Sequence, residues 1–164
     1  MENHEWKEDI IVEGIDPLIY LIANKFYLTA KSLSNHFTEP IVVNIAFSIE
    51  LYLKCLKTKT TYSKKKNTDS PILERKLDTI FGHNFVELFK KLKATEQNNL
   101  SIQYFEKHNS NLSQDFEEIK NAFIEYRYSF EKNSLSINLN ILNRVADFLK
   151  EYIECEMRQK RYSR

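Results

Sequence analysis

The sequence predicts an all-α protein, an antiparallel bundle of about five or six helices. Composition is the first reason for this expectation. Only two glycines and three prolines occur among 164 residues, so few positions favour turns, while 42% hydrophobic and 29% charged residues suit amphipathic helices. The second reason is spacing, because apolar residues recur every three or four positions over long stretches, which is the period of one helix face.

The length of the chain fits one helical domain spanning residues 1–164. We expect its core to lie between about residues 17 and 155, with a flexible N-terminus and C-terminal tail. Cys55 and Cys155 lack the paired spacing of a metal or redox site, so free thiols in a reducing compartment are expected. No signal peptide and no run of about 18 apolar residues is present. These observations favour a cytoplasmic protein without membrane association.

Each proline stands where a helix can begin, because the amide hydrogen that proline lacks has no partner in a first helical turn. The first helix is expected from Pro17 to His36, with Asp16 as its cap. The second is expected from Pro40 to Lys57. This second segment is apolar around most of its circumference, which predicts a central helix that is packed on several sides.

The middle of the chain combines turn signals with short helical patterns. Residues 58–69 read as a polar loop, and a short helix is expected to start at Pro71 and stop at Gly82. Asn84 is a good cap for the next helix, with Glu87 placed to reach back toward it. Residues 94–111 combine turn-like sequences with a possible helical stretch, so their order stays open.

The last third of the chain predicts two more helices. Ser113 is expected to cap a helix that continues to Phe130, and a final helix is expected over residues 136–160. The predicted core draws on the apolar stripes of all these segments. Its members are Ile45, Ile49, Leu53, Phe89, Phe123, Phe130 and Phe148.

Two helices interrupt an apolar face with an acid and a base one turn apart. These pairs are Glu50 with Lys54 and Arg127 with Glu131. Each can be an ordinary ion pair at a bundle edge. The sharper hypothesis is that they converge, so that Arg127 faces the central helix and is held by Glu50 and Glu131, with Lys54 and Tyr126 beside them. Such a polar cluster between packed helices, with His83 as a further member, would be the best candidate site, and Arg127 and Glu131 its candidate catalytic residues.

Three stretches of the chain resemble the HEPN family, the higher-eukaryote and prokaryote nucleotide-binding domains. They are "AFSIELYLKCLK" from Ala46, "GHNFVELFKKL" from Gly82 and "YRYSFE" from Tyr126. In that family the second helix carries an alanine, glutamate and lysine pattern, a "GH" step opens the third helix, and an arginine lies in a late helix. The resemblance implies a helical bundle that forms a homodimer, often binds or cuts RNA, and commonly acts beside a nucleotidyltransferase-like antitoxin.

The cutting members of the family use an arginine and a later histidine with about four to six residues between them, without a metal or other cofactor. The matching arginine is Arg127, but positions 132, 133 and 134 hold lysine, asparagine and serine. His83 matches the "GH" step, although a lone histidine there is more often a capping or packing residue. The resemblance therefore favours a non-catalytic module that binds RNA or a partner protein in a toxin–antitoxin or defence context. A metal-independent ribonuclease with a divergent site around Arg127 is the alternative.

The net charge of +1 gives no general attraction to nucleic acid, so RNA contacts would depend on local basic stretches. Two such stretches occur, from Lys57 to Lys66 and from Met157 to Arg164. No phosphate-binding glycine loop, metal-binding histidine pair or recognisable nucleophile is present. A nucleotide or small-ligand site in the bundle is a third hypothesis. The RNA-contact candidates are Lys64, Lys65, Lys66, Arg158, Lys160 and Arg161.

Overall fold

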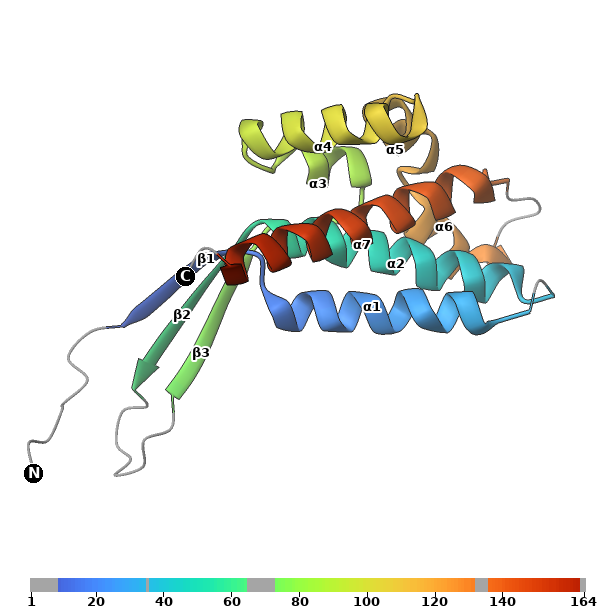
Figure 1. Ribbon diagram of the computed structural model, residues 1–164. Helices are drawn as coiled ribbons and strands as arrows, with labels where there is room; N and C mark the ends of the chain where they lie inside the picture. Colours follow the sequence, from blue (N-terminus) through green and yellow to red (C-terminus); the bar gives the residue numbers. More distant parts are fainter. Residues whose placement is uncertain (1–8, 35, 65–72, 132–135, 163–164) are drawn as a thin grey trace, which may run out of the picture.

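In the computed structural model, helices form the body of the molecule and a small antiparallel sheet projects from one end (Figure 1). The structure describes residues 9–34, 36–64, 73–131 and 136–162. The helical bundle that the sequence predicts is therefore present, but the protein is not all-α.

Helix α2 (Thr38–Leu56) is the central element, as its sequence predicts. Helix α1 (Pro17–Ser32) packs along one side of it and α7 (Leu139–Tyr162) along another (Figure 1). The side chain of Asp16 caps α1 by accepting from the backbone N–H groups of Leu18 and Ile19, at 2.9 and 3.1 Å. Helix α1 ends at Ser32, before the predicted end at His36.

A three-stranded sheet includes segments for which the sequence predicted a loop and a helix. Strands β1 (Ile10–Gly14), β2 (Thr58–Lys64) and β3 (Leu73–Thr79) pair antiparallel in the order β1-β2-β3. The polar loop predicted for residues 58–69 is thus a strand as far as Lys64, and the helix predicted after Pro71 is a strand from Leu73. The prediction followed proline and glycine signals and overlooked the threonine-rich β2, whose β-branched residues suit a pleated strand.

The sheet is fixed to the bundle through the cap of α1. Thr60 donates to Oδ2 of Asp16 at 3.0 Å, and the Arg75 guanidinium forms an ion pair with the same oxygen. Because side chains alternate along strands, every second residue of the sheet shares the side of Thr60 and Arg75. We call this side the inner face of the sheet. By register it also carries Ile10, Val12, Tyr62, Leu73 and Leu77.

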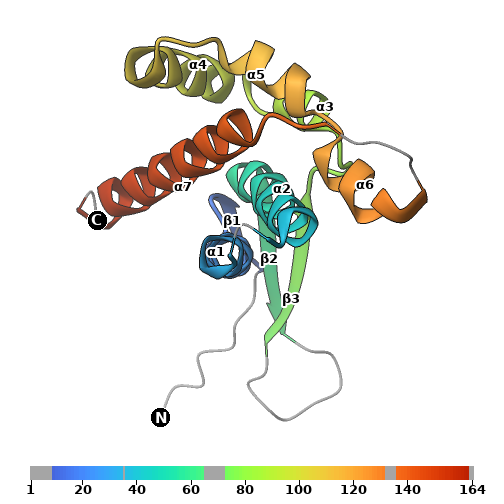
Figure 2. The same cartoon turned by 90° about the vertical axis from the view of Figure 1, so that its right-hand side faces the viewer.

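A row of shorter helices covers the rest of α2 and α7 (Figure 2). Asn84 caps α3 (Phe85–Lys90) by accepting from the N–H of Glu87, as predicted. Residues whose order the sequence left open form α4 (Ala94–His108), which ends where Asn109 adopts a left-handed φ of 49°. The next helix, α5 (Leu112–Ile119), is capped by Asn111 and not by the predicted Ser113.

The helix predicted to run from Ser113 to Phe130 is broken. After α5 the chain turns at Lys120 and Asn121, and α6 (Ala122–Arg127) begins in a new direction, followed by a 3₁₀ turn (Ser129–Glu131). The backbone N–H of Phe85 bonds to the Lys120 carbonyl at 3.2 Å, a partner that a continuous helix would have used internally. As a result α5 packs on α3, whereas α6 packs on α2.

The predicted core is largely confirmed, since its residues from α2, α3, α6 and α7 are buried; the side chain of Phe130 lies outside the described residues. A buried polar group joins three of the helices. The Tyr104 hydroxyl donates to Asp115, and the Arg144 guanidinium pairs with the same carboxylate at 2.7 Å. The confirmed core residues are Ile45, Ile49, Leu53, Phe89, Phe123 and Phe148.

Candidate functional site

Glu50 is the most deeply buried charged residue that the sequence singled out, with 1% of its surface exposed. One carboxylate oxygen accepts from Nζ of Lys54 at 2.6 Å, one turn later on α2. The other oxygen lies 2.9 Å from Nδ1 of His83. Both oxygens therefore have a charged or polar partner, which offsets the cost of removing the carboxylate from water. The predicted Glu50–Lys54 pair is confirmed, and His83 joins it.

The loop between β3 and α3 places His83 over Glu50. Gly82 has a φ of +128°, a conformation that side-chain-bearing residues rarely adopt, so glycine is required directly before the histidine. On one side of this position Lys91 donates to the Phe81 carbonyl at 2.7 Å, and on the other Asn84 caps α3. The chain on both sides of the histidine is thus held by hydrogen bonds of the Lys91 and Asn84 side chains.

The orientation of the His83 ring leaves one nitrogen available for chemistry. A carboxylate only accepts hydrogen bonds, so Nδ1 carries the hydrogen that points to Glu50 and the neutral ring has its lone pair on Nε2. About half of the side chain is exposed, at 52%. Among the described residues no hydrogen bond to Nε2 is found. An exposed imidazole oriented by a buried carboxylate can accept and return a proton.

The aromatic neighbours of His83 connect it to α6. The His83 ring lies 5.6 Å from the Phe123 ring, and Phe47 stacks on Phe123 at 5.0 Å. The guanidinium carbon of Arg127 lies 5.7 Å from the same Phe123 centroid. A histidine and an arginine therefore contact one aromatic ring, although they come from separate parts of the chain.

The predicted position of Arg127 is wrong. The residue is exposed, its Nη2 donates to the Tyr128 hydroxyl at 2.9 Å, and its guanidinium carbon lies 5.0 Å from the Tyr128 ring. It forms no ion pair with Glu50 or Glu131 among the described residues, and Glu131 is itself exposed. The physical reason is the break before α6, because the prediction assumed one continuous helix when it assigned Arg127 to the face toward α2.

Tyr126, also predicted for the cluster, lies on the buried side of α6. Burial raises the pKa of its hydroxyl, with a further contribution from the negative charges of Glu39 and Glu125. The carboxylates that act on this hydroxyl are thus Glu39 and Glu125, and not the Glu50 of the predicted cluster. The structure brings together Glu50, Lys54 and His83, and it places Arg127 beside them through Phe123.

Of the predicted RNA-contact residues, Arg158 and Lys160 lie at the other end of the molecule, where the sheet begins and α7 ends (Figure 1). Arg158 and Lys160 are exposed on α7, and Lys160 Nζ lies 3.3 Å from the position that a side chain on Gly14 would occupy. Lys65 and Lys66, and the side chains of Lys64 and Arg161, lie outside the described residues. Arg158 and Lys160 are thus not part of the group around His83.

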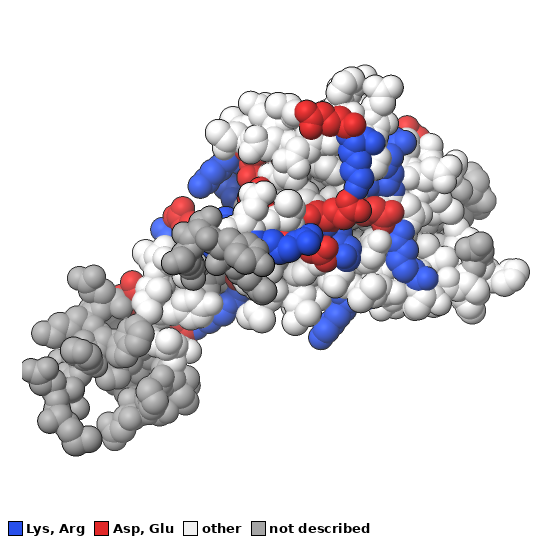
Figure 3. All heavy atoms as spheres, in the orientation of Figure 1, with Lys and Arg blue, Asp and Glu red and all other residues white. Residues whose placement is uncertain are grey.

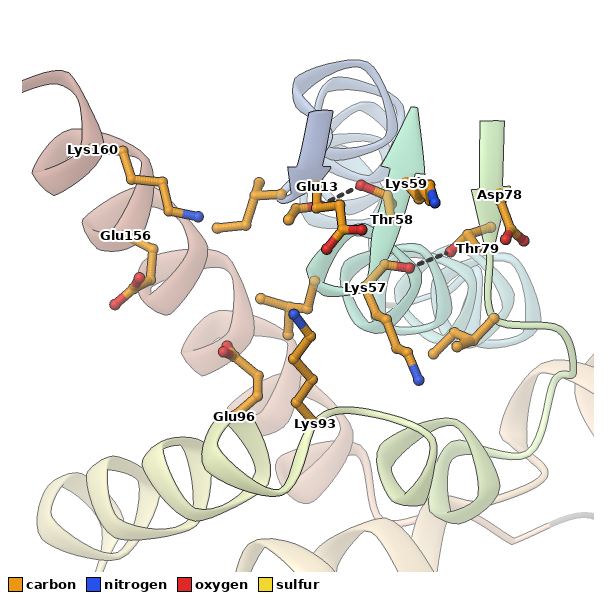
Figure 4. Close-up of a pocket in the computed structure, with 14 residues that line it drawn as sticks. Glu13, Lys57, Thr58, Lys59, Asp78, Thr79, Lys93, Glu96, Glu156 and Lys160 are labelled. Atoms are coloured by element: carbon orange, nitrogen blue, oxygen red, sulfur yellow. Dashed lines mark hydrogen bonds between the residues drawn. The ribbon is translucent and has the colours of Figure 1, made fainter. Parts of the chain in front are cut away.

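A cavity of about 600 Å³ lies at this second end, between the sheet, the end of α2, α4 and α7 (Figure 4). Figure 4 shows Lys93 and Lys160 directed toward the same space as the Glu13 carboxylate. The cavity is lined by four basic and four acidic residues, so it has no preference for anions. The charged lining residues are Lys57, Lys59, Lys93, Lys160, Glu13, Asp78, Glu96 and Glu156.

Charges of both signs also alternate over the face of the molecule shown in Figure 3, where acidic and basic side chains lie next to each other. The described residues contain no group of three potential ligands that could hold a metal ion. None of the helices in the described part of the chain is both long and apolar enough to cross a membrane. Neither a metal site nor a membrane-spanning helix is therefore found among the described residues.

Comparison with known proteins gives no relative for this chain: no family model, curated protein or solved structure matches it. The case for the site therefore depends on its geometry. The sequence hypothesis included His83 in the same polar cluster as Glu50, but it did not predict a direct contact between the two side chains. The one available signal was the glycine before the histidine, which indicates a turn that fixes the direction of the next side chain.

Proposed function

We propose that this protein is an HEPN-like helical module that binds single-stranded RNA at the surface formed by Phe81, His83, Arg127 and Tyr128. The observation that carries this proposal is the contact of His83 and Arg127 with one aromatic ring, Phe123. Single-stranded nucleic acids are bound by cations that contact phosphates and by aromatic rings on which bases stack.

The exposed aromatic residues at this surface support the proposal. Phe81, directly before Gly82, has 78% of its surface exposed, which is the highest value among the large hydrophobic residues described. Tyr128 is exposed at 37% and carries the Arg127 guanidinium against its ring. An exposed phenylalanine beside a histidine, and an arginine on a tyrosine, offer flat surfaces for bases next to positive charge.

The resemblance to HEPN proteins supports the same conclusion from the sequence. Its three stretches lie on α2, at the start of α3 and on α6, and they contribute Glu50, His83 and Arg127 to one region. The biological setting that we propose, a toxin–antitoxin or defence system with a nucleotidyltransferase-like antitoxin or another protein as partner, depends on this resemblance.

A metal-independent ribonuclease is the second candidate, and the Glu50–His83 pair favours it. In this reaction Nε2 of His83 accepts the proton of a ribose 2′-hydroxyl, whose oxygen attacks the adjacent phosphorus. The bond to the 5′-oxygen breaks, a proton is returned to that oxygen, and a 2′,3′-cyclic phosphate remains. Arg127 would stabilise the added negative charge on the phosphate oxygens. His83 would then serve in place of the histidine that is absent after Arg127.

The experiment that tests both functions uses fluorescein-labelled single-stranded RNA in a buffer with EDTA. Fluorescence anisotropy reports binding, and a denaturing gel of the same samples reports cleavage. For an RNA-binding module, we expect Arg127→Ala and Phe81→Ala each to weaken binding about tenfold, because one charge-assisted or stacking contact contributes about 1–3 kcal/mol. Arg158→Ala, a change of an exposed arginine at the other end of the molecule, is the matched control.

The outcomes distinguish the candidates. RNA that is bound and left intact supports the binding module. Cleavage that both His83→Ala and Arg127→Ala abolish, while Arg158→Ala retains it, assigns the ribonuclease. Loss of binding in Arg158→Ala but not in Arg127→Ala would place the RNA site at the second end of the molecule and contradict the proposal.

A further inference from the structure

The cavity at the second end of the molecule is a separate site from the group around His83, with which it shares no lining residue. Gly14, Thr58 and Thr79 line it from the three strands of the sheet, and α4 and α7 lie across from them (Figure 4). Its volume of about 600 Å³ is in the range of small-molecule sites. A ligand bound there does not depend on RNA binding at the other site.

Part of the lining of this cavity is apolar. Leu56 at the end of α2 and Ile80 directly after β3 are each 8% exposed, and Ile15 is partly buried against the core. The backbone beside them is fixed, since the Thr79 hydroxyl lies 3.0 Å from the Lys57 carbonyl oxygen. An apolar group of a ligand can pack against these residues and leave water.

Three charged side chains point into the cavity from different elements. Figure 4 shows Lys160 of α7, Glu13 of β1 and Lys93, directly before α4, directed toward the same space. Gly14 keeps this space open, because it has no side chain and its φ of +113° disfavours any other residue. A side chain there would begin 3.3 Å from Nζ of Lys160. The charged groups thus surround a space that glycine leaves free.

The opposite charges around the cavity do not pair with each other. In the part of the chain that the structure describes, no ion pair joins any two of the eight charged lining residues. Two of them have other partners, since Lys57 donates to the Lys91 carbonyl at 2.6 Å and the Tyr152 hydroxyl donates to Glu96. The three that point inward form no side-chain hydrogen bond within the described residues, so both signs of charge are available to a ligand.

We propose that the cavity binds a zwitterion with an apolar side chain, either a free amino acid such as leucine or a short peptide of such residues. Lys93 and Lys160 bind the carboxylate, and Glu13 binds the ammonium group. The apolar side chain packs on Leu56 and Ile80.

Ligands with a single charge fit this lining less well. An anion satisfies the two lysines but brings its charge close to Glu13, and an amine satisfies Glu13 but is repelled by the lysines. Inorganic phosphate is disfavoured for the same reason, because four acidic residues line the cavity. A zwitterion places one charge of each sign where the protein offers the opposite one.

Isothermal titration calorimetry with leucine and with leucyl-leucine, each at up to about 10 mM, tests the proposal. We expect saturable binding of at least one of them, and the comparison shows whether the free amino acid or the peptide is preferred. Two derivatives of the ligand that binds each lack one charge. The N-acetylated form has no ammonium group and the amidated form has no carboxylate. Each should bind about tenfold more weakly, because one charge-assisted interaction is lost.

Variants of the protein assign each charge of the ligand to its partner. Glu13→Gln should weaken binding of the unmodified ligand but leave that of the acetylated form unchanged, because this form has no ammonium group. Lys93→Met and Lys160→Met should weaken binding of the unmodified and acetylated forms, but not of the amidated one. Lys25→Met and Glu39→Gln, at exposed positions of α1 and α2, are the matched controls and should bind like wild type. Circular dichroism checks that every variant is folded.

Three results would each overturn the proposal. The first is the absence of binding of both leucine and leucyl-leucine, by calorimetry and by ligand-observed NMR. The second is an acetylated ligand that binds as tightly as the unmodified one, or displacement of the ligand by equimolar phosphate, since either would make the cavity a plain anion site. The third is a folded Glu13→Gln variant that binds the unmodified ligand as wild type does.

Discussion

Glu50 and His83 lie 33 positions apart in the chain, yet the carboxylate of the first is 2.9 Å from Nδ1 of the second. The contact joins the middle of the central helix to the loop before α3. It also gives the buried carboxylate its second partner beside Lys54. Glu50 is therefore both a structural residue of the core and the group that orients the histidine.

Replacing Glu50 tests the structural part of this role. Glu50→Ala should lower the free energy of unfolding by about 3 kcal/mol, because Lys54 remains largely buried without its partner. Urea denaturation followed by circular dichroism measures the change. Glu50→Leu combined with Lys54→Met, which removes both charges, should recover much of the loss. A loss below about 1 kcal/mol for Glu50→Ala would show that the pair contributes no more than a surface ion pair.

Arg127 and Arg144 are both on helices but should differ in their effect on stability. Arg127 is exposed, so Arg127→Ala should change the free energy of unfolding by less than about 1 kcal/mol. Arg144→Ala should cost about 2–3 kcal/mol, because it leaves the buried Asp115 carboxylate without its cation. Parallel urea titrations check the ranking. Equal losses for the two variants would contradict the exposed position of Arg127.

Asp16 predicts how stability changes with pH. Burial acts to raise the pKa of this carboxyl, but hydrogen bonds from the Ile19 amide, Arg75 and Thr60 outweigh it, so the pKa lies below its ordinary value of 3.8. A lowered native pKa adds stability that is fully present above the ordinary value and is lost as the pH falls through the native one.

Asp16→Asn removes this contribution while keeping an oxygen that can cap α1. The variant should be about 1–2 kcal/mol less stable than wild type at neutral pH, and the difference should shrink in acid. Urea unfolding at about pH 7 and about pH 3 measures it. A difference that is the same at both pH values would mean that the charge of Asp16 does not contribute.

The sequence predicted features that depend on neighbouring residues. The caps at Asp16 and Asn84, the buried α2 and the Glu50–Lys54 pair all follow from spacings of a few positions. Prediction from the sequence failed where a helix break or a partner far away in the chain determines the structure. The turn at Lys120 redirected Arg127, and β1 and β2 are strands because they pair with each other across two helices.

His83 shows the same limit within the candidate site. The "GH" step indicated a turn, but the partner of the histidine depends on where the chain from β3 returns to α2. Local spacing carries no information about that distance. The position of the half-exposed His83 ring beside Phe123 was therefore not predictable, whereas the pairing of Glu50 with Lys54 was.

The register of the sheet sets an order for folding. Gly14 pairs with Thr58, and the segment between them contains the whole of α1 and α2. Joining two strands across so long a segment carries a large entropic cost unless the segment is already compact. Strands β2 and β3 can form a local hairpin, whereas β1 pairs favourably only after α1 and α2 have packed as a helical hairpin and brought Gly14 to Thr58. The first strand of the chain is therefore among its last elements to fold, and its stability depends on the packing of two helices that it hardly touches.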